Sequence, residues 1–298
     1  MTLTRFVLAA ALLTAPALLA NQGQSPGRDT PAPGAPRGQA PGPAGRTQGG
    51  GRPPAPTQAA RQAALPGQSE GLDPRALLQP LAESWTSYSG DYTGRRYSAL
   101  TQINQSNVKN LTLAWVAKLT AGPGAPAGFG RGGAPQVIVG GEGTGDFAAG
   151  AANIKGSILQ VDGVLYLSAP DNAWAIDARD GRELWHYYWK TKGGTHIGSR
   201  GMGMWKNYVY FETPDNYLVS LDAKTGKERW HVEIADFDQQ YFSTMAPMVI
   251  GDHVLAGTGN ALDAPGFLQS FDPETGKLQW KFYTVPMKPG DPGLETWP

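Results

Sequence analysis

The sequence of 298 residues contains no cysteine, and its four histidines do not stand at the spacings of metal ligands. The absence of cysteine excludes disulfide bonds and a lipid anchor on an N-terminal cysteine. An excess of charge of either sign is also missing, because 25 Lys and Arg residues balance 25 Asp and Glu residues. This balance does not favour nucleic acid or an anionic membrane as a partner.

The apolar run at the N-terminus is short. Arg5 precedes an apolar segment over Phe6–Leu13, and small residues recur over 15–20. The segment is shorter than the roughly 18 apolar residues of a membrane-spanning helix. We therefore expect residues 1–20 to be a cleaved signal peptide, with an uncleaved anchor as the alternative. Cleavage predicts a periplasmic or secreted protein without a membrane span.

The next segment, 21–76, is rich in Pro, Gly, Ala and Gln and has little apolar surface to bury. This composition predicts a disordered linker. A folded domain is then expected over 77–298, with a Gly-rich insert over 121–150. Within the insert, Gly140–Gly145 follows a strand-like run, which raises a nucleotide-binding loop as an alternative to a flexible loop. The G-x-G-x-x-G spacing is not met and no helical pattern follows, so a flexible loop is favoured.

One eleven-residue phrase recurs three times. Each copy reads as a strand, a turn with Asp and Gly, and a strand that ends in Trp. The turn Asp residues lie 45 and 50 residues apart, a spacing that suits a four-stranded propeller blade. We expect the Asp to accept hydrogen bonds from turn amides, the Gly to supply a positive φ in a bulged hairpin, and the Trp to dock between blades. The copies are Ala175–Trp185, Ser220–Trp230 and Ser270–Trp280.

Short β-branched and aromatic runs, separated by turn signals, recur around these phrases. Examples are Val164–Leu167, Tyr208–Phe211 and His253–Ala256. The predicted fold class is all-β, a partial β-propeller of about four blades, with a short helix over Asp73–Glu83 ahead of it. An open arc of blades leaves strand edges and blade faces uncovered. We therefore expect either a fragment or a propeller whose other half comes from another chain.

Two further segments carry a family resemblance. Residues Trp85–Trp115 resemble the mature N-terminus of the pyrroloquinoline-quinone-dependent (quinoprotein) alcohol dehydrogenases, and Leu268–Pro286 is similar to another segment of that family. The repeated Trp phrase resembles the family's blade-docking motif. The resemblance covers about 85–298 and implies an eight-bladed propeller that holds the quinone, and usually Ca²⁺, near its axis. Family members are much longer, so the resemblance also implies a fragment.

The resemblance assigns cofactor-binding roles to Arg200, Thr213 and Thr258. A guanidinium can pair in a fork with carboxylates or quinone oxygens, and the hydroxyls can donate to a cofactor carboxylate. A surface-loop Arg and ordinary strand Thr residues are the alternatives. Ala261 and Lys155 stand where the family has glutamates. The glutamate at the position of Ala261 is a Ca²⁺ ligand in the family. Calcium is therefore doubtful, and Lys155 becomes a candidate cofactor contact that replaces the cation.

Two functions are compatible with these residues. The first is an exported quinoprotein dehydrogenase that oxidises an alcohol or sugar by two electrons and passes them to an acceptor. The second is a non-catalytic propeller scaffold that binds a protein or glycan in the periplasm, and fold alone does not separate the two. The resemblance puts the family's catalytic Asp and second metal ligand beyond residue 298. No catalytic residue or metal ligand is assigned, and we expect the 298 residues alone to be inactive.

Overall fold

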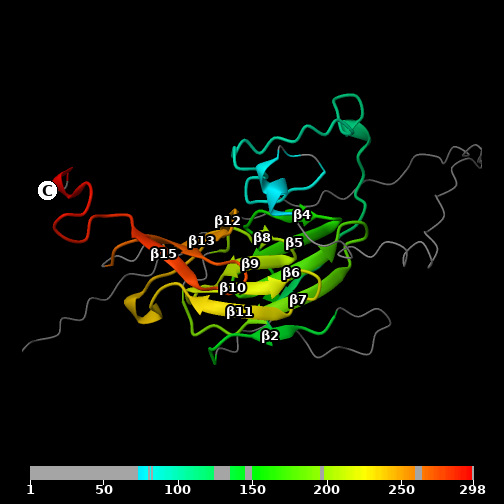
Figure 1. Cartoon of the computed structure of the whole chain (residues 1–298). Helices are drawn as coiled ribbons and strands as arrows, with labels where there is room; N and C mark the ends of the chain where they lie inside the picture. The colour runs from blue at the N-terminus through cyan, green and yellow to red at the C-terminus, as the bar shows by residue number, and fades with distance from the viewer. Residues whose placement is uncertain are drawn as a thin grey trace, which may run out of the picture. The chain divides into compact units, whose positions relative to one another are not determined.

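The computed structural model describes residues 73–79, 81, 83–123, 135–144, 150–194, 198–258 and 264–296. The regular structure in these ranges is strand, apart from short 3₁₀ helices. The predicted signal peptide and all but the last residues of the predicted linker lie outside the described residues. In chain order the elements are η1 (Pro74–Leu78), η2 (Val108–Asn110), β1 (Thr120–Ala121), β2 (Ile138–Gly140), β3 (Gly150–Ala151), β4 (Leu159–Val161), β5 (Val164–Ala169), β6 (Asn172–Asp177), β7 (Glu183–Trp189), β8 (Gly203–Trp205), β9 (Tyr208–Glu212), β10 (Tyr217–Asp222), β11 (Glu228–Glu233), η3 (Phe237–Gln239), β12 (Met248–Ile250), β13 (His253–Gly257), β14 (Phe267–Phe271), β15 (Leu278–Tyr283) and η4 (Leu294–Thr296) (Figure 1).

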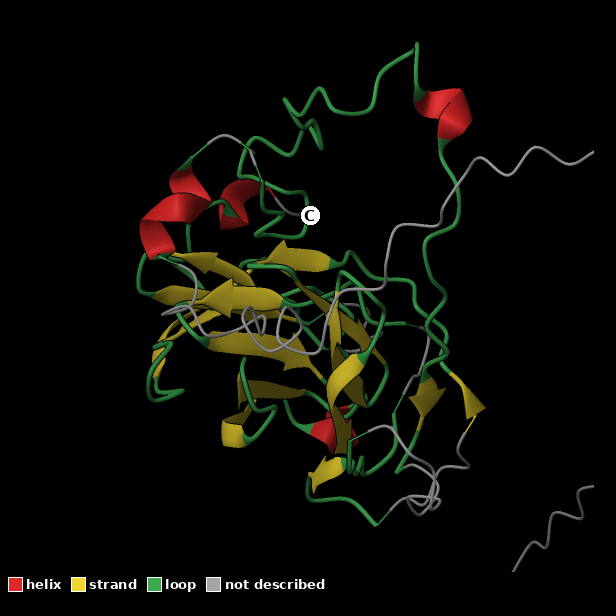
Figure 2. Ribbon diagram, turned by 90° about the vertical axis from the view of Figure 1, so that its right-hand side faces the viewer, coloured by secondary structure: helices red, strands yellow, loops and turns green. Residues whose placement is uncertain are grey.

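Consecutive strands form three antiparallel four-stranded meanders (Figures 1 and 2). We call β4-β5-β6-β7 the first blade, β8-β9-β10-β11 the second blade and β12-β13-β14-β15 the third blade. The pair β1-β3 forms a separate two-stranded sheet. Meanders of this kind are the blades of β-propellers. The prediction of an all-β, partial propeller is confirmed.

The first blade also carries a fifth strand, β2, from the Gly-rich insert. Ile138–Gly140 pairs in parallel with Tyr187–Trp189 of the outer strand β7. The chain then continues along the blade, where the Gly143 amide donates to the Lys190 carbonyl at 2.8 Å. The sequence predicted a flexible loop after the strand-like run. In the part of the insert that the structure describes, the strand-like run pairs with β7, and Gly140 and Gly143 hydrogen-bond to the backbone of Lys190, directly after that strand.

Glu142, in the same insert, joins the first blade to the second. Its carboxylate accepts a hydrogen bond from the Tyr217 hydroxyl at 2.8 Å and lies 3.2 Å from both Lys192 Nζ and His231 Nε2. The Tyr217 hydroxyl, His231 and Lys192 lower the pKa of Glu142 to about 2. Burial lowers the pKa of His231, but hydrogen bonds to Glu228 and Glu142 outweigh it, and the net pKa is raised.

The repeated turn forms as predicted. In the second and third blades, Asp222 and Asp272 accept the amides two and three residues on, at 3.1 and 2.8 Å in each case. In the first blade Asp180 replaces the turn Thr, and Asp177 accepts one amide at 3.0 Å and pairs with Arg179 at 2.7 Å. The glycine of each turn has a φ of 70° to 75°, and the strand register shifts beside each turn. The predicted bulged hairpin is thus confirmed.

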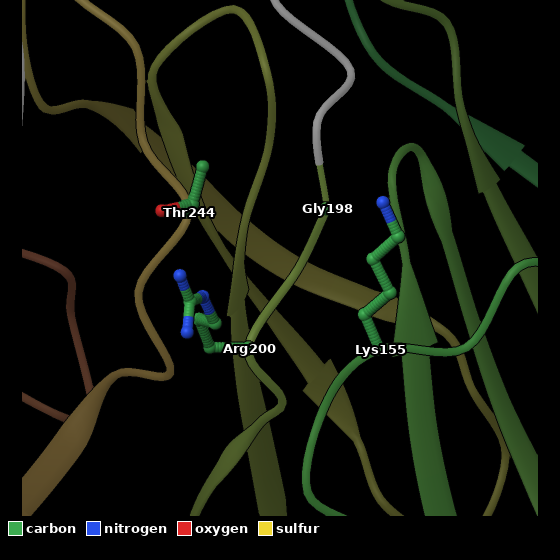
Figure 3. Close-up of a pocket in the computed structure, with 4 residues that line it drawn as sticks. All are labelled: Lys155, Gly198, Arg200 and Thr244. Carbon is green, nitrogen blue, oxygen red and sulfur yellow. The ribbon is translucent and has the colours of Figure 1, made fainter.

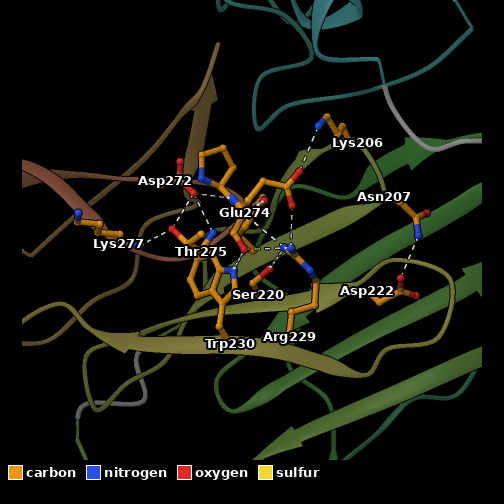
Figure 4. Close-up of polar contacts among 12 residues, drawn as sticks. Lys206, Asn207, Ser220, Asp222, Arg229, Trp230, Asp272, Glu274, Thr275 and Lys277 are labelled. Carbon is orange, nitrogen blue, oxygen red and sulfur yellow. Dashed lines mark hydrogen bonds and ion pairs between the residues drawn. The ribbon is translucent and has the colours of Figure 1, made fainter.

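Docking tryptophans lie on the turn glycine of the following blade. A Cβ on Gly226 would come within 2.6 Å of the Trp185 ring, and a Cβ on Gly276 within 2.7 Å of the Trp230 ring. The indole N–H groups donate to backbone carbonyls of the same turns, at 2.9 Å for Trp185. The distance is 3.0 Å for Trp230, whose contact with Glu274 is drawn in Figure 4. Glycine is therefore required both by the close approach and by the positive φ.

Trp115 and Trp280 depart from the expected pattern. Trp115 docks on Gly181 of the first blade, with its indole N–H donating to the Ala178 carbonyl at 3.1 Å, although no repeated phrase precedes it. Trp280 was expected to pack on a neighbouring blade, but its side chain is 39% exposed and no described residue forms that blade. Every residue of β15 is exposed, so the third blade presents the open face that an incomplete arc predicts.

The core lies within and between the blades. One cluster of buried apolar side chains extends through all three. Between the first and second blades, Tyr187 meets Phe211 edge to face, with ring centroids 5.9 Å apart. Between the second and third, the buried Tyr210 hydroxyl donates to the Pro273 carbonyl at 2.9 Å. These contacts fix each blade against the next.

The helix predicted over Asp73–Glu83 is the shorter 3₁₀ helix η1. The Asp73 side chain caps it by accepting the Arg75 amide at 2.9 Å, and Leu77 anchors it in the core. None of the helices in the described ranges has the length and apolarity needed to cross a membrane.

Candidate functional site: a cationic pocket at the inner blade edges

The edge strands β4, β8 and β12 begin the three blades, and a cavity of about 330 Å³ lies beside the segments that precede them. Lys155 precedes β4, Arg200 precedes β8, and Thr244 precedes β12. These three residues and Gly198 are the described residues that line the cavity (Figure 3). Each blade therefore contributes one side chain from the same place in its architecture.

Backbone hydrogen bonds tie the three segments together. The Arg200 amide donates to the Thr244 carbonyl, and the Ser157 amide donates to the Arg200 carbonyl, both at 2.9 Å. A Cβ on Gly156 would lie 2.7 Å from the Gly201 nitrogen, closer than real Cβ atoms approach. Glycine directly after each charged pocket residue thus allows two segments from different blades to meet.

The side chains of Lys155 and Arg200 are exposed and extend to the same side of the backbone in Figure 3. Gly198, with a φ of 153°, lies against the stem of Lys155, where a Cβ would be 3.2 Å from Lys155 Cδ. The buried Ser199 anchors the segment before Arg200, with its Oγ 2.7 Å from the Oγ of Ser168. Two cationic groups therefore share one pocket, and its described lining contains no carboxylate.

The two predicted threonines take equivalent places, Thr213 directly after β9 and Thr258 directly after β13. The Thr213 hydroxyl donates to Asp215 at 2.5 Å and accepts the Tyr217 amide at 2.9 Å, so it is engaged in its own turn. The Thr258 hydroxyl is buried and has no hydrogen-bond partner in the described part of the chain. Neither lines the cavity as formed by the described residues, and Ala261 lies outside those residues.

Thr244 is a pocket residue that sequence analysis missed. Its hydroxyl is the neutral polar group beside Arg200 in Figure 3. Its place in the repeat could have identified it, because the pocket residue stands three or four positions before the first strand of each of the three blades. Thr244 lacks the following glycine that marks Lys155 and Arg200, so only the repeat spacing could have found it.

Glu212 is a buried acid at the end of β9, directly before Thr213. Neither carboxylate oxygen has a hydrogen-bond partner of ordinary geometry among the described residues. Burial raises the pKa of Glu212 well above its ordinary value, and the nearby amides of Gly257 and Met245 offset only part of this. Burial thus favours the protonated form of this side chain.

The described pocket does not suit a divalent metal. Calcium takes six to eight oxygen ligands, several of them carboxylates. The lining offers one hydroxyl and two cationic side chains, and nowhere in the described ranges do three or more His, Asp or Glu residues group to hold a metal ion. The chemistry instead suits an anionic ligand, for which Arg200 offers a planar fork and Lys155 a point charge.

Residues 85–298 match the family model of the PQQ-type glucose/ethanol/alcohol dehydrogenase β-propeller domain. The chain is 34% identical over 234 residues to quinohemoprotein alcohol dehydrogenase ADH IIB of Pseudomonas putida, covering 75% of this chain and 29% of that protein. It is 36% identical over 216 residues to the dehydrogenase subunit of alcohol dehydrogenase (quinone) of Gluconobacter oxydans, covering 68% and 25%.

Solved structures agree with this match. The quinohemoprotein alcohol dehydrogenase ADHIIG of Pseudomonas putida superposes with a TM-score of 0.56 at 31% identity, over 78% of this chain and 31% of that one. The quinohemoprotein alcohol dehydrogenase of Comamonas testosteroni gives a TM-score of 0.54 at 30% identity, over 74% and 30%. The chain spans less than a third of the length of these relatives.

Proposed function

Because this chain belongs to the PQQ-type glucose/ethanol/alcohol dehydrogenase β-propeller family, we propose that it is the cofactor-binding part of an exported quinoprotein dehydrogenase that oxidises an alcohol or a sugar. The observation that carries the proposal is the shared cavity of Lys155 and Arg200 at the inner blade edges. When bound, pyrroloquinoline quinone supplies the acceptor for the two electrons of the oxidation.

The pocket residues fit that cofactor in size and charge. A cavity of about 330 Å³ is within the usual range for small-molecule sites. Pyrroloquinoline quinone is planar and carries carboxylates, which Arg200 can hold bidentately and Lys155 by its ammonium group. Thr244 adds a hydroxyl, and we place the Thr213 and Thr258 hydroxyls near the cofactor on the family resemblance alone.

Calcium is left out of the proposal, since the described lining lacks carboxylates and the family resemblance puts Ala261 at the position of a metal ligand. Export is proposed from the N-terminal pattern of Arg5, Phe6–Leu13 and the small residues after it. Fusing residues 1–20 to a phosphatase that is active only outside the cytoplasm tests this. Phosphatase activity at the level of a leaderless control would refute export.

Gel filtration after incubation with pyrroloquinoline quinone tests cofactor binding. We expect quinone absorbance to elute with the protein and to be reduced in an Arg200→Gln variant. A dye-linked assay with ethanol and with glucose then tests turnover, which we do not expect from these 298 residues, because none of the described pocket residues offers a catalytic base. Failure of the quinone to co-elute would favour the other candidate, a non-catalytic scaffold for a protein or glycan, which the uncovered face of β15 also suits.

A further inference from the structure

The charge of the pocket sets a condition on whatever binds there. Lys155 and Arg200 both reach into it, and its remaining described lining is Gly198 and Thr244. A divalent cation placed among these groups would meet two positive charges and no described carboxylate. An anion in the same place would be attracted by both positive charges.

Backbone contacts hold the segments from which the two cationic side chains extend. The hydrogen bonds from Arg200 to Thr244 and from Ser157 to Arg200 lock the segments on which both side chains stand. The close approach of Gly156 to Gly201 leaves little room for these segments to shift. The two segments that carry the cationic side chains are therefore fixed relative to each other without a ligand, so the pocket offers both positive charges to an anion with little backbone rearrangement.

We propose that this pocket binds its planar, polycarboxylate cofactor without a divalent metal, with Lys155 and Arg200 supplying the positive charge. This inference rests on the proposed function, since it assumes that the ligand is the quinone. Arg200 provides the oriented, bidentate contact. Lys155 provides the charge that a metal ion would otherwise supply, and so determines whether binding depends on metal.

Calorimetric titration of the full chain with pyrroloquinoline quinone, in EDTA and again in excess Ca²⁺, tests the inference. The wild type should bind in EDTA, with a Kd that Ca²⁺ changes by less than about threefold. Lys155→Glu should weaken binding in EDTA by at least about tenfold, and Ca²⁺ should restore part of the loss. Lys155→Arg keeps the charge and should stay close to the wild type.

Lys224→Glu is the matched control. Lys224 lies in the exposed turn of the second blade, so the variant makes the same change in net charge away from the pocket. Its Kd should stay within about twofold of the wild type, because an exposed charge so placed is screened by salt. Far-UV circular dichroism of each variant checks that the blades are intact.

The possible outcomes separate this inference from the proposed function. Binding by the wild type only in the presence of Ca²⁺ would overturn metal independence and leave quinone binding standing. Equal weakening by Lys155→Glu and Lys224→Glu would show that Lys155 has no local role, which also overturns the inference. Absence of quinone binding by folded wild type, with and without Ca²⁺, would overturn both proposals.

Discussion

The docking tryptophans provide a graded test of how the arc of blades is held together. Trp185 and Trp280 occupy the same place in the repeated phrase and in the outer strand of their blades. Only Trp185 has a described blade to dock on. Replacing each by alanine therefore separates the contribution of docking from that of the residue within its own blade.

The structure gives the size of the expected difference. Trp185 is 3% exposed and Trp280 is 39% exposed. For a side chain of roughly 250 Å², the difference in exposure means that Trp185 buries roughly 90 Å² more than Trp280, which is worth about 2 kcal/mol. Trp185 also donates to the Ala223 carbonyl, which adds about 1 kcal/mol. We expect Trp185→Ala to lower the free energy of unfolding by about 3–5 kcal/mol, and Trp280→Ala by about 3 kcal/mol less.

Urea unfolding followed by far-UV circular dichroism is the suitable assay, because fluorescence would change with the number of tryptophans. Midpoints are compared at unchanged slope, which indicates that the transition itself is the same. Equal losses in the two variants would refute the reasoning, since Trp280 would then be covered in solution. Gel filtration at several concentrations would show whether a second copy covers it.

Other contacts make further predictions. Glu212→Gln removes a buried acid whose folded pKa is raised, so the cost of this acid to stability grows as the pH rises above the ordinary value of 4.5. In urea unfolding the variant should match the wild type near pH 4 and exceed its unfolding free energy increasingly as the pH rises, and a gain that does not vary with pH would contradict this. Glu142→Gln should be most destabilising between pH 4.5 and pH 6.5, the ordinary pKa values of Glu and His. The lowered pKa of Glu142 means that its contribution is lost as the pH falls toward 2, and the raised pKa of His231 means that its contribution is lost as the pH rises. If urea unfolding gave a difference in unfolding free energy between variant and wild type that did not change with pH, it would count against this cluster. Gly226→Ala should lower the thermal midpoint more than Gly163→Ala, because both glycines have positive φ but only Gly226 lies under a docking indole, and equal losses would show that the backbone angle alone matters.

The blades could be predicted because their signals are local. In each repeated phrase the Asp, the Gly and the Trp act within eleven residues, and the turn amides that Asp222 and Asp272 accept are two and three positions away. The pairing partner of β2 could not be predicted in the same way, although the run itself is strand-like in sequence. Its pairing with β7 joins distant segments and depends on an open strand edge that only the folded blade provides.

The pocket was only partly predictable. Lys155 and Arg200 were found through the family resemblance, and the structure places them in one cavity. Thr213 was assigned in the same way, but its hydroxyl is engaged by Asp215, two residues on. A sequence resemblance shows which position corresponds to a family residue, but it does not show which group the side chain hydrogen-bonds. It therefore could not show that the Thr213 hydroxyl is engaged by Asp215. Convergence of three loops also depends on blade packing, which no local pattern specifies.

The architecture separates the residues that hold the fold from those that form the pocket. The docking residues Trp185 and Trp230 stand on the outer strands β7 and β11, where they contact the turns of the next blade. Pocket side chains stand before the inner edge strands, on segments held by backbone hydrogen bonds that charge-changing substitutions such as Lys155→Glu leave in place. Because Lys155 and Arg200 are exposed, changing their charge costs little packing energy. Loss of cofactor binding in these variants, with the blades intact, would therefore report on the pocket itself.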